Sequence, residues 1–281
     1  FPAADTVTVE TGGSERFRIA DDGDVIIGGS SDAGYANYAD NLTIHGTGNE
    51  GITIRSGTTS QGAIYFSDAT GSGTGTYEGS VIYDHNDNYM TLATNHNERL
   101  RIDSSGRLLL GLTSARSVGD VTSVSQIEGT SFANSSLSLM ANAGASAGNQ
   151  VHLTLGKSRG TSDGSSTVVA SGDGLGLIQW AGADGTDCNT VAAKIHAFVD
   201  GSPGSNNMPG RIGFYTTPDA TGLVERLRIN SIGQTIIGDT VAQLSTNAER
   251  PLQVHSVNGP KIAIGRNDTS IVDGNTIGGI E

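Results

Sequence analysis

The sequence predicts an elongated, repetitive all-β fold in which short strands are joined by tight turns. Glycine accounts for 41 of 281 residues, about twice its usual share, and short strings alternate apolar and polar residues along the whole chain. A fourteen-residue stretch occurs three times, as ERFRIADDGDVIIG from Glu15, ERLRIDSSGRLLLG from Glu98 and ERLRINSIGQTIIG from Glu225. A recurring stretch of this kind indicates a chain built from similar structural units.

We call this recurring stretch the signature. Alternation along a strand predicts that Glu15, Phe17 and Ile19 share one face and that the two arginines between them share the other. The next four residues suit a type I turn that ends on glycine, so each signature should form a β-hairpin. All copies share an isoleucine as their fifth residue (Ile19, Ile102 and Ile229). The charged residues and glycines common to all copies are Glu15, Arg16, Arg18, Gly23 and Gly28; Glu98, Arg99, Arg101, Gly106 and Gly111; and Glu225, Arg226, Arg228, Gly233 and Gly238.

The signatures divide the chain into units. The predicted units are residues 1–28, which end one unit, 41–111, 122–238 and 250–281, which begin another. The unit 122–238 carries insertions at about 130–150 and 181–209. Because the chain starts and stops inside a unit, we expect a segment of a longer fibrous protein in which an aromatic residue follows Glu281.

Strings within the units are expected to be strands. They are Leu42–His45, Ile52–Arg55, Gly62–Phe66, Gly79–Tyr83 and Tyr89–Ala93, then Ser125–Glu128, Leu153–Lys157, Gly176–Trp180 and Gly210–Phe214, then Pro251–His255 and Ile262–Arg266. Residues 190–199 fit either a strand or a short helix. A Gly-x-(Ile/Val)-x-aromatic pattern occurs four times, with Phe66, Tyr83, Trp180 and Phe214 at its aromatic position. We expect these aromatic side chains in the core.

Composition excludes several classes of function. The chain has 16 Lys and Arg against 29 Asp and Glu, a formal net charge of −13, which disfavours binding to nucleic acid or to an anionic membrane. Cys188 is the only cysteine, so neither an intrachain disulfide nor a cysteine-based zinc site is possible. No apolar run approaches the roughly 20 residues of a membrane-spanning helix. No cofactor-binding motif in a suitable context is present.

Two groups of charged residues invite a chemical interpretation. Asp21–Asp24 resembles part of a calcium loop, but the other two signatures lack these carboxylates, so a turn is the better interpretation. The Glu-Arg-x-Arg set could be an active-site cluster, yet a catalytic site is rarely repeated once per module. We therefore expect Arg16, Arg99 and Arg226 to lie on a polar face and to pair with Glu or Asp across strands or subunits.

The sequence predicts no catalytic or metal site. The six histidines are scattered, although His45 and His255 occupy matching positions, and one histidine per chain could still meet on a trimer axis. Tailspike-type enzymes cleave polysaccharide with paired carboxylates, but no pair is fixed by spacing. The available acids include Asp173, Asp184, Asp187 and Asp200. The loop 30–40 lies outside the repeat strings, so Tyr35 and Tyr38 are candidates for surface contact.

Several motifs together resemble the repeat modules of bacteriophage tail fibres, especially those of phages of marine and cyanobacterial hosts. They are ERLRIDSSGRLLLG, the loop Ala183–Asp187, FVDGSPGSNNMPGRIGFYTT from Phe198 and the Leu-x-Val-His opening. The resemblance implies a homotrimeric β-rich shaft, located in the virion. Its partners would be other tail or fibre proteins and a glycan or protein of the host surface.

Physical reasoning agrees with a trimer. Val25–Ile27 and Leu108–Leu110 are apolar on both faces, and such strands are buried only if another chain or unit covers the second face. Closing sheets around an axis would also remove exposed edges. We therefore expect a non-enzymatic segment of a tail fibre that spans distance and contributes to host attachment. The alternatives are a non-viral surface adhesin or filament subunit and a polysaccharide depolymerase.

Overall fold

The computed structural model describes residues 6–28, 42–69, 73–142, 148, 150–218, 222–238 and 252–254. Tyr35, Tyr38, His255 and the string Ile262–Arg266 lie outside the described residues. The chain divides into two compact units, Phe1–Glu98 and Arg99–Glu281. Among the described residues there are sixteen strands, two short 3-10 helices and no α-helix. None of the described helices is long and apolar enough to cross a membrane.

The strands form three sheets, and in each sheet the spatial order of the strands follows their order in the sequence. The first contains β1 (Val7–Thr11), β2 (Ser14–Ile19), β3 (Val25–Ile27) and β4 (Leu42–Ile44). The second contains β5 (Gln61–Phe66), β6 (Gly79–Asp84), β7 (Tyr89–Thr94), β8 (Asn97–Ile102), β9 (Leu108–Leu110) and β10 (Ser125–Ile127). The third contains β11 (Gly174–Gly182), β12 (Thr190–Val199), β13 (Gly210–Thr216), β14 (Val224–Ile229), β15 (Thr235–Ile237) and β16 (Leu252–Val254).

Each signature folds into a hairpin, formed by β2–β3, β8–β9 and β14–β15. The turn of the second hairpin is closed by a hydrogen bond from the Gly106 amide to the Asp103 carbonyl, 2.8 Å long, and Gly106 has a φ of 76°. A left-handed residue at this position is what the bulged hairpin turn requires. The prediction of a turn that ends on glycine is therefore confirmed. It could be made from the sequence because the turn residues and the glycine are neighbours in the chain.

The second strand of each hairpin also pairs in parallel with the string that opens the next predicted unit, which alternation alone did not reveal. These pairs are β3 with β4, β9 with β10 and β15 with β16. The last glycine of the signature makes room for this crossing. An added Cβ at Gly28 would lie 2.0 Å from the His45 carbonyl oxygen, and one at Gly111 would lie 2.2 Å from the Glu128 carbonyl oxygen.

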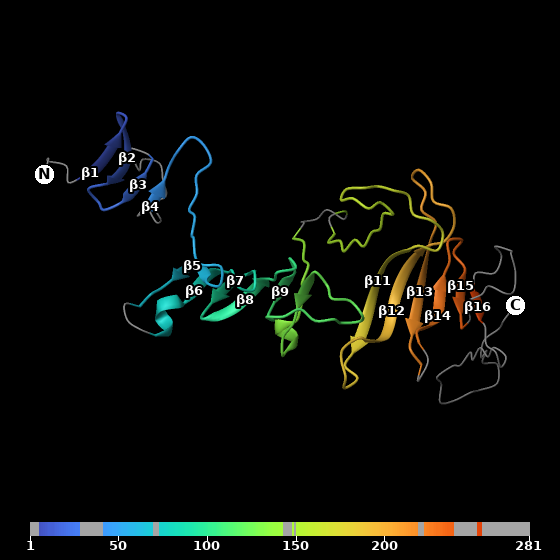
Figure 1. Ribbon diagram of the computed structural model, residues 1–281. Helices are drawn as coiled ribbons and strands as arrows, with labels where there is room; N and C mark the ends of the chain where they lie inside the picture. The colour runs from blue at the N-terminus through green and yellow to red at the C-terminus, as the bar shows by residue number, and fades with distance from the viewer. Residues whose placement is uncertain are drawn as a thin grey trace, which may run out of the picture. The chain divides into compact units, whose positions relative to one another are not determined.

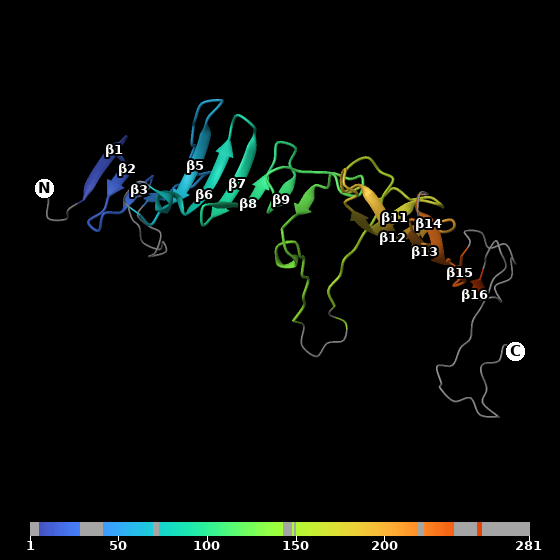
Figure 2. The ribbon, with the colours of Figure 1, turned by 90° about the horizontal axis from the view of Figure 1, so that it is seen from below.

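The other strand pairs are antiparallel. In the unit Phe1–Glu98, strands β5, β6 and β7 lie side by side (Figure 2) with matched ends. In the unit Arg99–Glu281, strands β11 to β15 form an antiparallel row (Figure 1), and residues 190–199 form the strand β12. Two 3-10 helices, η1 (Thr74–Tyr77) and η2 (Phe132–Asn134), lie in connecting segments.

The hydrophobic core is thin. Among the described residues, the buried apolar side chains are Ile26, Leu109, Val169, Val199 and Ile236. Three of these are the middle residue of a signature's second strand, so each hairpin contributes one fully enclosed residue. A core of this size agrees with the low apolar content of the sequence.

Two predictions about the apolar strings are wrong. Ile52–Arg55 and Leu153–Lys157 are not strands, because no neighbouring strand in the described chain pairs with them. The aromatic positions are not in the core: Phe66 is 60% exposed and Trp180 53% exposed. Tyr83 and Phe214 also belong to the exposed apolar residues. The physical reason is that, within one chain, these faces of the sheets are left largely uncovered.

Candidate functional site

The first strand of the signature contains a β-bulge that changes which residues share a face. In β2, Phe17 pairs with Val9 and Glu15 with Glu10, which leaves Arg16 without a partner position. In β14, Leu227 pairs with Phe214 and Glu225 with Tyr215, which leaves Arg226 in the same situation. A bulge inserts one extra residue and so reverses the alternation beyond it. The prediction that Glu15 shares a face with Phe17 and Ile19 is therefore wrong.

The bulge brings the glutamate to the face of the second arginine. Arg18 Nε lies 2.6 Å from Glu15 Oε1, and Arg228 Nε lies 2.7 Å from Glu225 Oε1. Each pair lies three residues apart on one strand rather than across strands or subunits. Glu225 is only 6% exposed, and a carboxylate this buried requires such a partner.

The first arginine of the signature points to the other face. Arg16 Nε donates to Thr11 Oγ1 at 3.3 Å, and Arg226 Nε donates to Thr216 Oγ1 at 2.9 Å. The expected carboxylate ladders of Arg16 and Arg226 are therefore not found within the described chain. Both side chains are exposed and bind a threonine hydroxyl on the neighbouring strand. The bulge is the cause, because it places Arg16 and Arg226 on the face opposite the signature's own glutamate.

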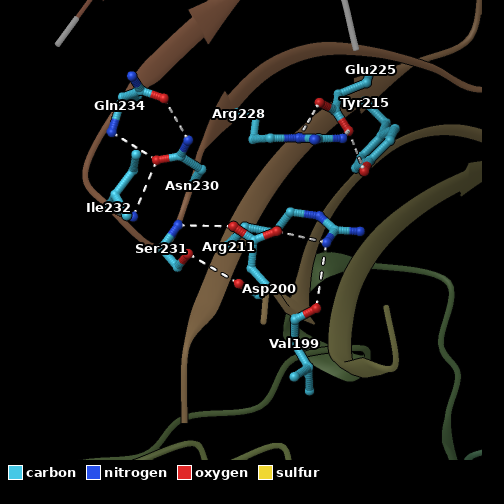
Figure 3. A network of polar contacts seen from close by, with 10 residues as sticks. All are labelled: Val199, Asp200, Arg211, Tyr215, Glu225, Arg228, Asn230, Ser231, Ile232 and Gln234. Carbon is cyan, nitrogen blue, oxygen red and sulfur yellow. Dashed lines mark hydrogen bonds and ion pairs between the residues drawn. The ribbon is translucent and has the colours of Figure 1, made fainter. Parts of the chain in front are cut away.

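Figure 3 shows the polar network on the face of the third sheet that carries Glu225 and Arg228. Tyr215 Oη donates to Glu225 Oε2 at 2.6 Å, and Arg228 Nη2 donates to the same oxygen at 2.9 Å. Burial, followed by the hydrogen bond to Glu225, raises the pKa of Tyr215 to about 12. Gly213 makes room for this ring, since a Cβ there would lie 2.8 Å from it. Tyr215 thus stays protonated and acts as a hydrogen-bond donor.

A second part of the network fastens the signature turn to the end of β12 (Figure 3). Arg211 Nη1 donates to Asp200 Oδ1 at 3.0 Å, and the Ser231 amide donates to Asp200 Oδ2 at 3.0 Å. Asn230 Oδ1 accepts the Gln234 amide at 2.8 Å. Asp200 and Glu225 both accept hydrogen bonds from the chain's own donors, so the network stabilises the sheet.

The acidic turn of the first signature behaves as a turn. Asp22 Oδ1 accepts the amide of Asp24 at 3.2 Å. In the second signature Asp103 Oδ1 accepts the amides of Ser105 and Arg107, at 2.9 and 3.0 Å. Side-chain oxygens that bind nearby amides are the usual reason for Asp and Asn in turns.

Each of the carboxylates considered for polysaccharide cleavage binds different neighbours and has its own structural role. Hydrogen bonds from Arg159 hold the pKa of Asp173 well below its usual range, and a bond from the Thr190 hydroxyl lowers that of Asp184 to about 2. Partial burial opposes the shift at Asp200, yet hydrogen bonds from Ser231 and Arg211 leave its pKa lowered. Asp187 accepts the Asn189 amide at 2.8 Å. A general acid needs a raised pKa, which these shifted groups do not have.

The histidines are distributed over both units. Among the described residues, no group of three or more His, Cys, Asp or Glu side chains is placed to hold a metal ion. His45 follows β4 and donates its amide to Ile27. His196 stacks on Phe198 with ring centroids 3.8 Å apart, and burial, with Lys194 and Arg211 nearby, lowers its pKa.

A groove of about 360 Å³ lies on one face of β5–β7. Its walls carry Tyr65 from β5, Tyr77 from η1 and Tyr89 from β7, and its floor carries Ser80 and Thr91. Sequence reasoning missed this groove because its residues come from separate strings. A local signal in the sequence is the pair of turn residues Asn95 and His96, which follow β7.

The opposite face of these strands is apolar. Ile64, Val81 and Leu92 are register partners across β5, β6 and β7. In the third sheet a similar row runs across five strands, through Ile178, Ile195, Phe214, Leu227 and Ile237. Several members of both rows are exposed. Rows of exposed apolar side chains mark surfaces that bind another protein chain.

No protein-family model and no curated protein matches this sequence. Two solved structures from bacteriophage T5 are similar in fold. The carboxy-terminal domain of its L-shaped tail fibre is 14% identical, with a TM-score of 0.51 over 84% of this chain and 99% of that one. The same domain with its intramolecular chaperone domain is 15% identical, with a TM-score of 0.53 over 86% of this chain and 72% of that one. This protein therefore has an all-β fold similar to that of a phage tail fibre.

Proposed function

We propose that this chain is a structural segment of a phage tail fibre, which assembles as a homotrimer, spans distance and contributes to attachment to the host. The observation that carries the proposal is the pair of apolar rows. Ile64 and Leu92 are exposed in one row, and Phe214 in the other. Two copies of the same chain would cover these rows and close the sheet edges. The fold similarity to the T5 tail fibre supports the same setting.

The mass of the protein in solution tests the assembly. One chain has a mass of 28.7 kDa, so a trimer has 3 × 28.7 = 86.1 kDa. We expect light scattering to give the larger mass. Leu92→Asp places a charge in the apolar row and should reduce the mass to that of one chain. Ser104→Asp, in an exposed signature turn, is the matched control and should leave the trimer intact.

Either of two results would contradict the assembly: a mass of one chain for the unaltered protein, or an unchanged mass for Leu92→Asp. The viral setting has a separate test, because a surface adhesin could share the fold. Antibodies raised against this chain should label phage tails in electron micrographs. Labelling of cell surfaces in the absence of phage would favour the adhesin instead.

The proposed segment is not an enzyme. Asp173 and Asp184, which sequence reasoning considered for polysaccharide cleavage, are bound by neighbouring donors that keep them ionised. Incubation with host polysaccharide should therefore release no oligosaccharide. Release of oligosaccharide by the purified protein would instead support the depolymerase.

A further inference from the structure

The groove on β5–β7 contains aromatic and polar groups in a suitable arrangement for a small polar ligand. Its volume of about 360 Å³ is within the range of small-molecule sites. Tyr65 is 53% exposed and Tyr77 44% exposed, so two rings stand open beside it. Tyrosine provides a large, rigid contact area together with a hydroxyl, at little entropic cost on binding.

The floor of the groove is polar and enclosed. Ser80 and Thr91 are buried, and both line the groove. Both side chains carry a hydroxyl, which can donate and accept a hydrogen bond. Because both residues line the groove, these hydroxyls can bond to a ligand or to the water that a ligand displaces.

His96 is held at the rim at a cost to stability. Asn95 and His96 have φ values of 48° and 60°, the left-handed backbone of a type I′ turn, where glycine is favoured. His96 Nε2 lies 3.3 Å from Glu78 Oε2, and its ring stands edge-on to Tyr77 at 5.6 Å. Its Nδ1 is enclosed without a hydrogen-bond partner. Strained residues that survive in a structure cluster at ligand sites.

The lining limits the class of ligand. Among the described residues, no Lys or Arg lines the groove, whereas Glu98 does, so an anionic ligand would meet no compensating charge from them. Gln61, Ser80 and Thr91 present donors and acceptors, which disfavours a purely apolar ligand. A neutral sugar ring fits both conditions, because its C–H face packs on tyrosine and its hydroxyls bond to the polar floor.

We propose that this groove binds a neutral hexose or N-acetylhexosamine unit of a host-surface polysaccharide. The host-surface source rests on the proposed function, whereas the chemical class rests on the groove alone. Consecutive residues of a strand point to opposite faces, so Tyr65 and Ile64 lie on different sides of β5. A trimer that covers the apolar row therefore leaves the groove open to solvent.

An array of neutral oligosaccharides of hexose, deoxyhexose and N-acetylhexosamine, with sialylated oligosaccharides for comparison, tests the proposal. We expect the fluorescently labelled protein to bind at least one neutral oligosaccharide and to prefer it to its sialylated form. The double variant Tyr65→Ala/Tyr77→Ala should lose at least about tenfold in affinity, the loss expected when binding anchors are removed. Binding of no neutral saccharide, or unchanged binding by the double variant, would overturn the proposal.

Two further variants separate a ligand site from a folding defect and from the assembly. His96→Gly should weaken binding while the melting temperature stays constant or rises, because glycine suits the left-handed turn. Weaker binding with a lower melting temperature would instead indicate a structural histidine. Tyr83→Ala, on the apolar face, should reduce the mass in solution from that of a trimer to that of one chain, and should leave binding per chain unchanged. If the unaltered protein is a trimer that binds no sugar, only the groove proposal is refuted. If the unaltered protein is a monomer that binds sugar through Tyr65, only the assembly is refuted.

Discussion

Alanine at Gly111 should destabilise the protein far more than alanine at Gly106, although both glycines belong to one signature. Their φ values are similar, 80° and 76°, so both variants force an L-residue into the left-handed region. An added Cβ at Gly106 meets no atom within 4 Å. At Gly111 it would lie 2.2 Å from the carbonyl oxygen of Glu128, at the end of the parallel strand β10.

The expected magnitudes follow from these contacts. Left-handed backbone costs an L-residue about 1 kcal/mol, which should be the whole effect of Gly106→Ala. Gly111→Ala carries the same cost and also pushes β10 away. The bond from the Glu128 amide to the Leu110 carbonyl, 3.0 Å long, is then lost or stretched, at a further cost of about 2 kcal/mol with the associated packing. The difference of about 2 kcal/mol corresponds to roughly 4–8 °C in melting temperature.

Thermal unfolding followed by circular dichroism measures both variants, with the protein concentration held constant. The first signature supplies an independent pair, since a Cβ at Gly23 meets nothing within 4 Å and one at Gly28 would lie 2.0 Å from the His45 carbonyl oxygen. Equal melting temperatures for Gly106→Ala and Gly111→Ala would refute the reasoning. That result would mean that no parallel strand crosses the hairpin at its last glycine.

Three further measurements test the polar contacts. Gly213→Ala should push the Tyr215 ring away from Glu225, so the pKa of Tyr215 should fall from about 12 toward its ordinary value in an ultraviolet titration. Glu225→Gln should cost about 2 kcal/mol in urea unfolding because a buried charged hydrogen bond is lost, whereas Glu128→Gln, in a half-exposed pair, should cost less than about 1 kcal/mol. Asp184 has a folded pKa of about 2 against an ordinary 3.8, so its contribution is present above pH 3.8 and lost as the pH falls toward 2; Asp184→Asn should flatten the stability profile in that range.

The local parts of the fold were predictable because their causes lie close together in the sequence. In the second signature, Asp103 binds the amides of Ser105 and Arg107, and Gly106 supplies the left-handed residue. These residues fall within a single turn. Three copies of the signature also showed which positions the hairpin requires, so the all-β class and the hairpins followed from one sequence.

What sequence reasoning missed depends on partners that are distant in the chain. The bulge at Arg226 exists because β13 pairs Phe214 with Leu227 and Tyr215 with Glu225. This register cannot be predicted from the sequence of β14 alone. The exposure of Trp180 has a similar origin. Its position in a strand is local, but its burial depends on what covers that face. Alternation predicts the faces of a strand and not the surroundings of each face.

The bulge also explains how one signature can serve a chain with two different faces. Without it, Glu225 would lie on the face of Leu227 and would place a carboxylate in the apolar row. With it, Glu225 joins Arg228 and Tyr215 on the opposite face, where all their charges are paired. The apolar row therefore runs unbroken from Phe214 to Ile237. The motif thus keeps its glutamate out of the apolar row, although Arg226, bonded to Thr216, stays on the face of that row. The opposite face is left for the contacts of Glu225 with Arg228 and Tyr215.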